Sequence, residues 1–223
     1  MDKDTALKLA QESGIHYLQI LREEWEMIIL KILFESPVGK NLIFKGGTAL
    51  RLAYGSPRFS EDLDFSVLGA FPEGSFEETV KGIPKLFSQV RLTDYMYKYN
   101  TYLAKLAIKE LWSELPFRVK VEISKRGTFS SGSGYEMTLL SSSMTNMQAL
   151  GNVATLERIL EEKYLALNSR KKARDLFDIW YIEQKLKIET KLKGVLIPKK
   201  ELISDLRKYL PRSYWNIIDK LGG

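Results

Sequence analysis

The chain has 223 residues, of which 44% are hydrophobic and seven are proline, a composition typical of a globular protein with one sizeable core, or a core and a small second lobe. It contains no cysteine and a single histidine, His16, which excludes disulfides and thiolate metal sites and leaves carboxylates as the ligands for any metal. Residues 1–155 contain 18 Lys+Arg and 18 Asp+Glu, whereas residues 156–223 contain 16 and 10, so the net charge of +6 lies entirely in the last third. This excess favours a polyanionic partner such as nucleic acid, although solvated helices also carry a surplus of this size.

The N-terminal segment is predicted to form two helices. "TALKLAQESGIHYLQILREEWEMIILKILFES" places apolar residues at a helical period, and Gly14 divides the segment. His16 is expected on a helix face without a role in a site. The start of the chain is polar, and no run of about 18 apolar residues follows, so we expect a cytoplasmic protein without a membrane segment.

The next part of the chain is predicted to contain strands and helices. "NLIFKGGTALRLAYG" predicts a strand to Phe44, a Gly-Gly turn, and a helix with Thr48 as its N-cap. "RFSEDLDFSV" predicts the next strand, and residues 75–90 a helix. "VRLTDYMYKYNTYLAKLAIKE", with a turn signal near Asn100, predicts two antiparallel strands, and "PFRVKVEIS" predicts a further strand.

The remainder is predicted to be a seam followed by helices. Residues 127–152 are dense in Gly and Ser, which indicates a seam between lobes. From Ala154 the pattern is helical, with interruptions at "NSRKK", Pro198 and Pro211. The predicted organisation is an N-terminal helical packing segment (1–40), a core (41–152), and a basic helical C-terminal lobe (153–223) that completes the site.

"FSEDLDF" places two carboxylates on one face of a predicted strand. Because successive side chains of a strand point to opposite faces, Asp62 and Asp64 project together while Leu63 and Phe65 point into the core. Like charges this close repel unless a cation lies between them, and Mg²⁺ takes oxygen ligands from one or two carboxylates together with substrate phosphates. The pair therefore predicts a metal site; the alternative is a solvated strand face.

"KGGTAL" predicts a phosphate-binding turn next to this metal site. Gly46, Gly47 and Thr48 lie where a strand turns into a helix, and free N–H groups and the helix dipole at such a turn bind phosphate. Gly-Gly is also a common structural turn. Together, the turn and the carboxylates indicate a nucleoside triphosphate with Mg²⁺.

Two motifs resemble the AbiEii/AbiGii toxin family of nucleotidyltransferases, the toxin half of bacterial and archaeal abortive-infection toxin–antitoxin pairs. They are "KGGTALRLAYGSPRFSEDLDF" and "LERILEEKYLALNSRKKARDLFDIW", and the resemblance extends from Asn41 to Tyr181. It implies an α+β fold with a polymerase-β-like nucleotidyltransferase core, a mixed sheet flanked by helices, and a helical C-terminal lobe. It also implies transfer of a nucleotide or nucleotides from an NTP to an acceptor, which is tRNA for some relatives, and an antitoxin encoded nearby.

The matching positions receive the following roles. Asp62 and Asp64 are expected to hold Mg²⁺, or Mn²⁺ in its place, and to be catalytic together with Lys163 and Asp178. Gly46, Gly47, Thr48 and Ser60 are expected to line the phosphates, whose charge Arg58 and Lys163 offset. Of the matching positions in the second motif, three are expected to have supporting roles: Arg170, Arg174 and Asp175, with Asp175 orienting an arginine.

"VKVEIS" offers a third carboxylate. Val119, Val121 and Ile123 alternate inward, which places Lys120 and Glu122 on the other face. Nucleotidyl transfer usually adds a third carboxylate from an adjacent strand, so Glu122 is expected as a further metal ligand if its strand neighbours that of Asp62. A solvent-facing glutamate is the alternative.

If residues 163–178 formed one helix, Lys163, Arg170, Arg174 and Asp178 would share a narrow sector of its surface, although residues 168–172 are a candidate break. A solvated face with salt bridges is the alternative. At the level of function, transfer to a protein side chain and a non-catalytic nucleotide-dependent binding module compete with transfer to tRNA. The sequence identifies neither the NTP nor the acceptor.

Overall fold

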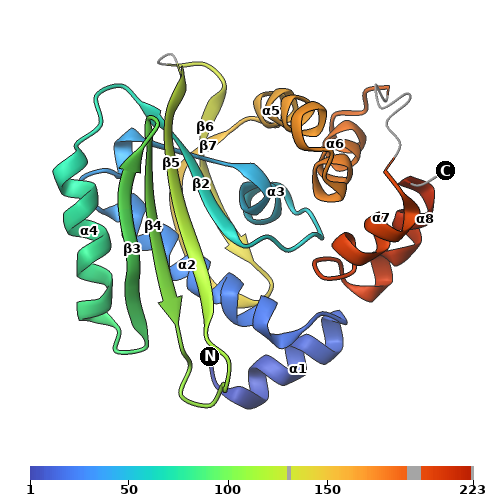
Figure 1. Ribbon diagram of the computed structural model, residues 1–223, viewed down its shortest axis with the longest axis horizontal. Helices are drawn as coiled ribbons and strands as arrows, with labels where there is room; N and C mark the ends of the chain where they lie inside the picture. The colour runs from blue at the N-terminus through green and yellow to red at the C-terminus, as the bar shows by residue number, and fades with distance from the viewer. Residues whose placement is uncertain (130–131, 190–196, 222–223) are drawn as a thin grey trace.

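A computed structural model describes residues 1–129, 132–189 and 197–221 and has the predicted α+β fold (Figure 1). Seven strands form one mixed sheet in the order β3-β4-β5-β2-β1-β7-β6, in which β2 pairs with β5 and β1 with β7 in parallel, and the other neighbours are antiparallel. The strands are β1 (Leu42–Lys45), β2 (Asp62–Leu68), β3 (Val90–Lys98), β4 (Thr101–Ile108), β5 (Phe117–Phe129), β6 (Tyr135–Ser142) and β7 (Thr145–Ala154).

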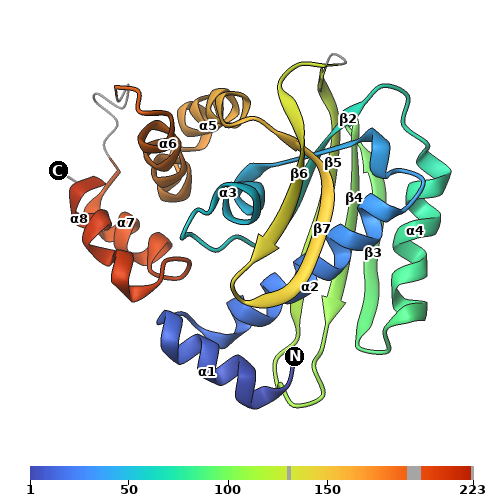
Figure 2. The same ribbon diagram turned by 180° about the vertical axis from the view of Figure 1, so that it is seen from behind.

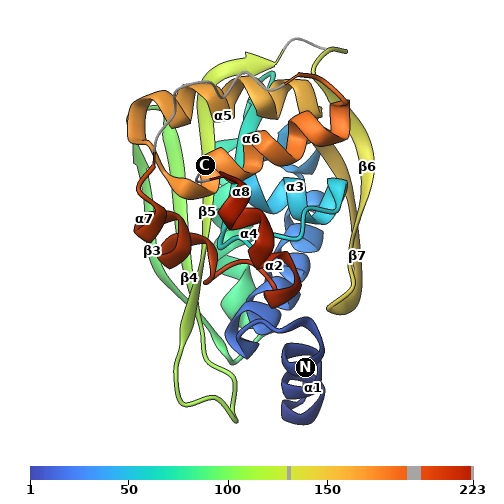
Figure 3. The ribbon, with the colours of Figure 1, turned by 90° about the vertical axis from the view of Figure 1, so that its right-hand side faces the viewer.

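One group of helices covers a face of the sheet, and a second group lies together beside the sheet. Figure 2 shows α2 crossing one face, with α4 beside β3, and in Figures 1 and 3 the last four helices lie together on another side of the molecule. No helix of the described residues is long and apolar enough to cross a membrane. The helices are α1 (Lys3–Ser13), α2 (Tyr17–Glu35), α3 (Gly46–Tyr54), α4 (Glu73–Leu86), α5 (Leu156–Arg170), α6 (Ala173–Leu186), α7 (Lys199–Leu206) and α8 (Trp215–Leu221), with short 3₁₀ turns η1 (Gly39–Asn41) and η2 (Arg212–Tyr214).

Alternating burial defines the two faces of the sheet. Phe44 and Phe65 are fully buried and in contact, and Phe34 of α2 packs against Phe65. In β4 the even-numbered residues, such as Tyr102, are buried, whereas the odd-numbered ones are half-exposed. The rings of Tyr102 and Phe76 of α4 are 6.1 Å apart, so α4 and α2 cover the apolar face and leave the other face for polar side chains.

Most of the predicted elements are confirmed. Gly14 ends α1 in the left-handed conformation (φ +67°), where glycine has no Cβ to clash. His16 accepts a hydrogen bond from the Leu18 N–H and caps α2, a structural role. The strands β3 and β4 pair antiparallel around Tyr99 and Asn100, and the last helices are interrupted at Lys171, Pro198 and Pro211.

The prediction for Thr48, close to the site, was wrong. Thr48 is not an N-cap, because α3 already begins at Gly46 with Lys45 in the capping position. The Thr48 side chain is buried, and its hydroxyl donates to the Asp62 carbonyl at 2.6 Å, which fixes α3 to β2.

The predicted seam at 127–152 was also wrong. Most of it forms β6 and β7, and β7 is an interior strand between β1 and β6. The many Gly and Ser residues of this segment make its alternation of buried and exposed residues hard to recognise in the sequence. Leu140 of β6 and Ala149 of β7 are paired and buried. The division of the chain at residues 40 and 152 stays a prediction, since one buried apolar cluster extends from Ala6 to Ile218.

Candidate active site

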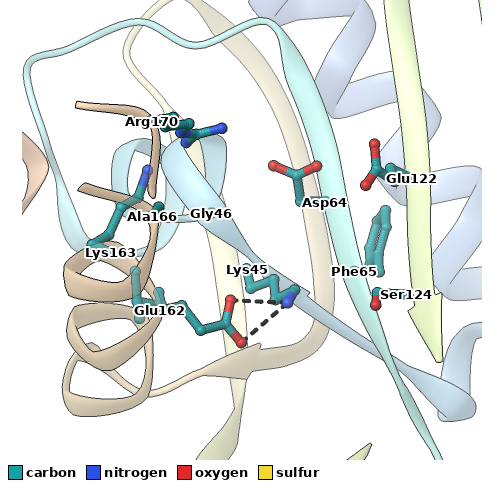
Figure 4. A pocket seen from close by; sticks show the side chains of 11 residues that line it. Lys45, Gly46, Asp64, Phe65, Glu122, Ser124, Glu162, Lys163, Ala166 and Arg170 are labelled. Carbon is teal, nitrogen blue, oxygen red and sulfur yellow. Dashed lines mark hydrogen bonds and ion pairs between the residues drawn. The ribbon is translucent and has the colours of Figure 1, made fainter. Parts of the chain in front are cut away.

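A cleft of about 270 Å³ lies between the polar face of the sheet and α5 (Figure 4). Asp64 and Glu122 lie on its sheet side, and Lys163 and Arg170 of α5 lie opposite them. Gly46 forms part of the wall where β1 turns into α3. The cleft therefore places carboxylates opposite cations beside a helix start.

The carboxylates come from two paired strands, as predicted. Asp62 is paired in register with Lys120, and Asp64 with Glu122, so all four side chains project from the same face. The Lys120 ammonium lies between two of the carboxylates, 3.2 Å from Asp62 Oδ2 and 3.1 Å from Glu122 Oε2. Sequence reasoning placed Lys120 on this face but gave it no role; here it is the resident cation of the carboxylate group.

Asp64 is the most perturbed member of this group. Burial, followed by the charge of Asp62, raises the pKa of Asp64 from 3.8 to about 6, and Glu122 acts in the same direction. The charges of Lys120 and Lys163 oppose this shift without cancelling it. Burial is therefore the main cause of the raised pKa of Asp64.

Both glycines are required by close approaches. Gly46 has φ +82°, and a Cβ at this position would lie 2.7 Å from Asp64 Oδ2. A Cβ on Gly47 would lie 2.8 Å from Ser60 Oγ and would collide with the Arg58 guanidinium. No side chain caps the first turn of α3, so its first N–H groups have no side-chain acceptor at the part of the wall that Gly46 forms.

The second motif folds as two helices that form one ion-pair network. Lys171 has φ +46° and ends α5, and α6 begins at Ala173. Lys163 Nζ lies 3.1 Å from Asp175 Oδ1 and 2.7 Å from Asp178 Oδ2. Arg170 donates to both oxygens of Asp175, at 2.7 and 2.8 Å, a contact that fits the expectation that Asp175 orients an arginine; that role stays a prediction.

Arg58 extends this network away from the cleft. Its Nε and Nη2 each donate to Asp178 at 2.7 Å, and Nη1 donates to the Phe59 carbonyl. Burial alone would raise the pKa of Asp178, but Arg58 and Lys163 together hold it below 3.8. Arg58 is 2% exposed and Asp178 fully buried, and neither lines the cleft, so a direct contact of Arg58 with phosphates stays a prediction.

The remaining predicted residues lie around the cleft rather than in its wall. Ser60 is half-buried beneath Gly47, and Asp62 lies next to Asp64 with its side chain 34% exposed. Arg174 is half-buried on α6, and its charge acts on the Tyr209 hydroxyl instead of joining Lys163 and Asp178.

Sequence reasoning missed three polar residues of the wall. Lys45 Nζ binds Glu162 at 2.8 and 3.0 Å, an ion pair that ties the end of β1 to α5 (Figure 4). Ser124 lines the cleft next to Glu122. Two features of the sequence could have indicated that Lys45 and Glu162 lie at the site. Lys45 directly precedes the Gly-Gly pair, and Glu162 directly precedes Lys163.

The carboxylates suit a hard divalent cation in chemistry and charge. The donors are carboxylate oxygens on adjacent strands, and burial and neighbouring negative charge raise the pKa of Asp64. A divalent cation bound to these oxygens would offset both the cost of burial and the repulsion between the carboxylates. Within the described residues, no group of three or more carboxylates or histidines is drawn together as a preformed site. Asp62 and Asp64 would hold the ion, and Glu122 would have to exchange Lys120 for it.

The comparisons with known proteins identify the family and the fold. The model of the family "Nucleotidyl transferase AbiEii toxin, Type IV TA system" matches residues 28–210. A putative nucleotidyltransferase from Helicobacter pylori is 26% identical, with 84% of this chain and 80% of that chain covered and a TM-score of 0.56. No curated protein matches.

Two further solved structures share the fold. JHP933 from Helicobacter pylori is 24% identical, with 86% of this chain and 79% of that chain covered and a TM-score of 0.57. MenT4, a nucleotidyltransferase toxin from Mycobacterium tuberculosis, is 19% identical, with 89% and 68% covered and a TM-score of 0.57.

The protein is a nucleotidyltransferase. It belongs to the AbiEii family of toxins of type IV toxin–antitoxin systems, as the resemblance of its two motifs predicted. Membership implies an NTP substrate and a cognate antitoxin, and the competing interpretation as a non-catalytic binding module is set aside.

Proposed function

We propose that the protein transfers nucleotides from an NTP to the 3′ end of RNA, tRNA in particular, in a Mg²⁺-dependent reaction that inhibits growth. The observation that carries the proposal is the cleft itself, in which Asp64 and Glu122 lie opposite Lys163 and Arg170 next to the uncapped start of α3. A triphosphate has the charge and size for this space, since its phosphates complement the cations and the helix N-terminus.

In the proposed reaction, an oxygen of the acceptor hydroxyl forms a bond to the α-phosphorus of the NTP. The bond from that phosphorus to the bridging oxygen breaks, and pyrophosphate leaves. Glu122, whose side chain is 38% exposed, takes the hydroxyl proton and passes it to water. A bound Mg²⁺ would supply charge neutralisation for the triphosphate and orient it for in-line attack.

The residues of the chain hold the substrate in the following way. The N–H groups of Gly46 and Gly47 would bind phosphate oxygens, because both residues lie in the first turn of α3, which no side chain caps. Lys163 and Arg170 would offset the phosphate charge from α5. Arg58, Asp175 and Asp178 would position these cations from below, a role that fits their burial better than contact with substrate.

The test is transfer of label from each of the four NTPs into total tRNA, with the parental protein and an Asp62→Asn variant, with and without Mg²⁺. We expect labelled RNA only with the parental protein and Mg²⁺, and growth inhibition on expression only from the parental gene. Label in a protein band and none in RNA would replace the RNA acceptor with a protein side chain. Label from Asp62→Asn at the parental rate would refute the assignment of the site.

A further inference from the structure

The polar face of the sheet continues beyond the cleft across β5, β4 and β3. Pairing in register places Asp64, Glu122, Leu103 and Met96 in one row from β2 to β3. With about 4.8 Å between neighbouring strands, the row extends about 14 Å from Asp64. Figure 1 shows β3, β4 and β5 unobstructed on this side, with no helix of the described residues drawn in front of them.

A second hollow, of about 340 Å³, lies on this row and shares Glu122 with the catalytic cleft. Met96 and Leu103 form its apolar floor, and Met96 is 39% exposed. Lys98, Tyr99 and Arg126 also line it, and all three are exposed. Glu122 therefore has the catalytic cleft on one side and an aromatic, basic hollow on the other.

Tyr99 has a backbone conformation that its residue type disfavours. The loop between β3 and β4 consists of Tyr99 and Asn100, with φ +52° and +63°, the positive-φ conformations of a two-residue hairpin turn. Such positions favour Asn, Asp and Gly, and a bulky residue there is an outlier. Tyr99 is 72% exposed as a residue, and Lys98 Nζ lies 4.9 Å from the centroid of its ring, so packing does not account for the tyrosine.

The charge of this face complements a polyanion. Its exposed or half-exposed side chains include five cations against the single carboxylate of Asp94, once Lys120 and the carboxylates of the catalytic site are set aside. The cations are Arg91, Lys98, Lys105, Arg118 and Arg126. Lys105 is paired with Asp94 at 3.0 Å, which leaves the charge of the others available to a ligand.

From these observations we infer that the open face of β3, β4 and β5 binds the single-stranded 3′ end of the acceptor RNA and guides its terminal hydroxyl to Glu122. Tyr99 stacks on a base above Met96, and Lys98 and Arg126 contact the flanking phosphates. An exposed aromatic ring between cations is the usual means by which proteins hold single strands with little sequence preference. The inference rests on the proposed function, which requires such an acceptor, and it places this acceptor on the sheet instead of the C-terminal lobe.

Two substitutions at Tyr99 separate stacking from folding. Tyr99→Asn supplies a residue that suits the positive-φ position, so the hairpin keeps its turn, and Tyr99→Phe keeps the ring. We expect Tyr99→Asn to raise the KM for an RNA acceptor about tenfold, the effect of losing one base–aromatic stack, with the KM for NTP unchanged. Tyr99→Phe should keep the parental values.

A charge-reversed pair tests the phosphate contacts. Lys98→Glu with Arg126→Glu should weaken binding of a labelled single-stranded RNA and lower its salt slope by about 1.4, at about 0.7 for each lost phosphate contact. Lys3→Glu with Lys40→Glu, two exposed lysines outside this face, is the matched control and should leave both values near those of the parent. Melting temperatures of all variants report on folding.

The outcomes distinguish failure of the proposed function from failure of the RNA-binding role of the sheet face. If the parental protein labels no RNA with any NTP, the proposed function fails and this inference fails with it. If RNA is labelled but Tyr99→Asn and the reversed pair both keep the parental acceptor KM and salt slope, only the inference is overturned. A rise in acceptor KM for both, with Tyr99→Phe and the control pair unchanged, supports it.

Discussion

The raised pKa of Asp64 predicts that its carboxylate destabilises the metal-free protein. Burial and the charge of Asp62 raise this pKa from 3.8 to about 6. Because the folded state binds the proton more tightly than the unfolded state, the proton's contribution to stability is fully present below about pH 4 and is lost as the pH rises through about 6. The difference of about two pK units corresponds to about 3 kcal/mol at about pH 8, since one unit is worth about 1.36 kcal/mol.

Asp64→Asn tests this directly, because the amide keeps the shape of the side chain and removes its ionisation. In EDTA at about pH 8 we expect the variant to be more stable than the parent by up to about 3 kcal/mol, or roughly 6–12 °C in melting temperature for a chain of this size. At about pH 5 the gain should shrink, because the parental carboxyl is then mostly protonated. Thermal unfolding followed by circular dichroism measures both differences.

Asp94→Asn is the matched control on the outer strand of the same face, and its effect should not follow this pH dependence. Mg²⁺ should raise the melting temperature of the parent at about pH 8 and leave that of Asp64→Asn unchanged, because only the parent gains a ligand pair. A variant no more stable than the parent at about pH 8, or one with the same gain at both pH values, would refute a desolvated carboxylate at Asp64.

Four further predictions concern the same site. Asp62→Asn should abolish transfer and growth inhibition with the melting temperature kept, because it removes a charge without opening a cavity; full activity with unchanged melting contradicts the metal assignment. Lys163→Ala should weaken NTP use more than RNA binding, with Lys163→Arg as the charge-retaining control, and equal losses in both assays would move Lys163 to the RNA surface. Arg58→Lys should lower stability by a few kcal/mol, measured by urea unfolding, because Lys cannot reproduce the forked pair with buried Asp178, and an unchanged midpoint would show that the fork is dispensable. Reversing four lysines of the C-terminal lobe should leave the salt dependence of tRNA affinity near that of the parent, because the acceptor is placed on the sheet face; a slope flattened by about 0.7 to 0.9 for each lost contact would move the acceptor to the lobe. The four are Lys171, Lys172, Lys199 and Lys200.

The strand that carries Asp62 and Asp64 was predictable because its signal is local. A side-chain period of two fixes which residues share a face, and Leu63, Phe65, Val119 and Val121 are all buried as the pattern requires. The strands β2 and β5 pair in parallel with Asp64 and Glu122 in register. The strand of Glu122 therefore neighbours that of Asp62, as the prediction of a third carboxylate required. Its role as a ligand stays a prediction.

The positions of Arg58 and Asp178 were not predictable from local pattern, because 120 residues separate the two members of this pair. The motif gave their order but neither their burial nor the forked hydrogen bonds that Arg58 donates to Asp178. Composition misled for residues 127–152 for a related reason. Ser and Gly are tolerated in β6 and β7 where the partner strand and Phe34 of α2 supply the packing, and Gly151 has no room for a Cβ beside the Phe34 ring.

A count of charged residues along the chain also does not reveal how charge is distributed over the folded surface. Residues 1–155 are balanced overall, yet many of their carboxylates pair with cations away from the open sheet face, as in Glu23 with Arg51 and Glu61 with Arg22. The cations of β3, β4 and β5 are thereby left in excess on one face of the sheet, although residues 1–155 contain equal numbers of basic and acidic residues. In the C-terminal lobe, where the count is most basic, Lys199 is already paired with Asp219 at 2.9 Å. Binding of a polyanion depends on unpaired charge within reach of the ligand, so the sheet face is the stronger candidate for the acceptor even though the sequence count favours the lobe.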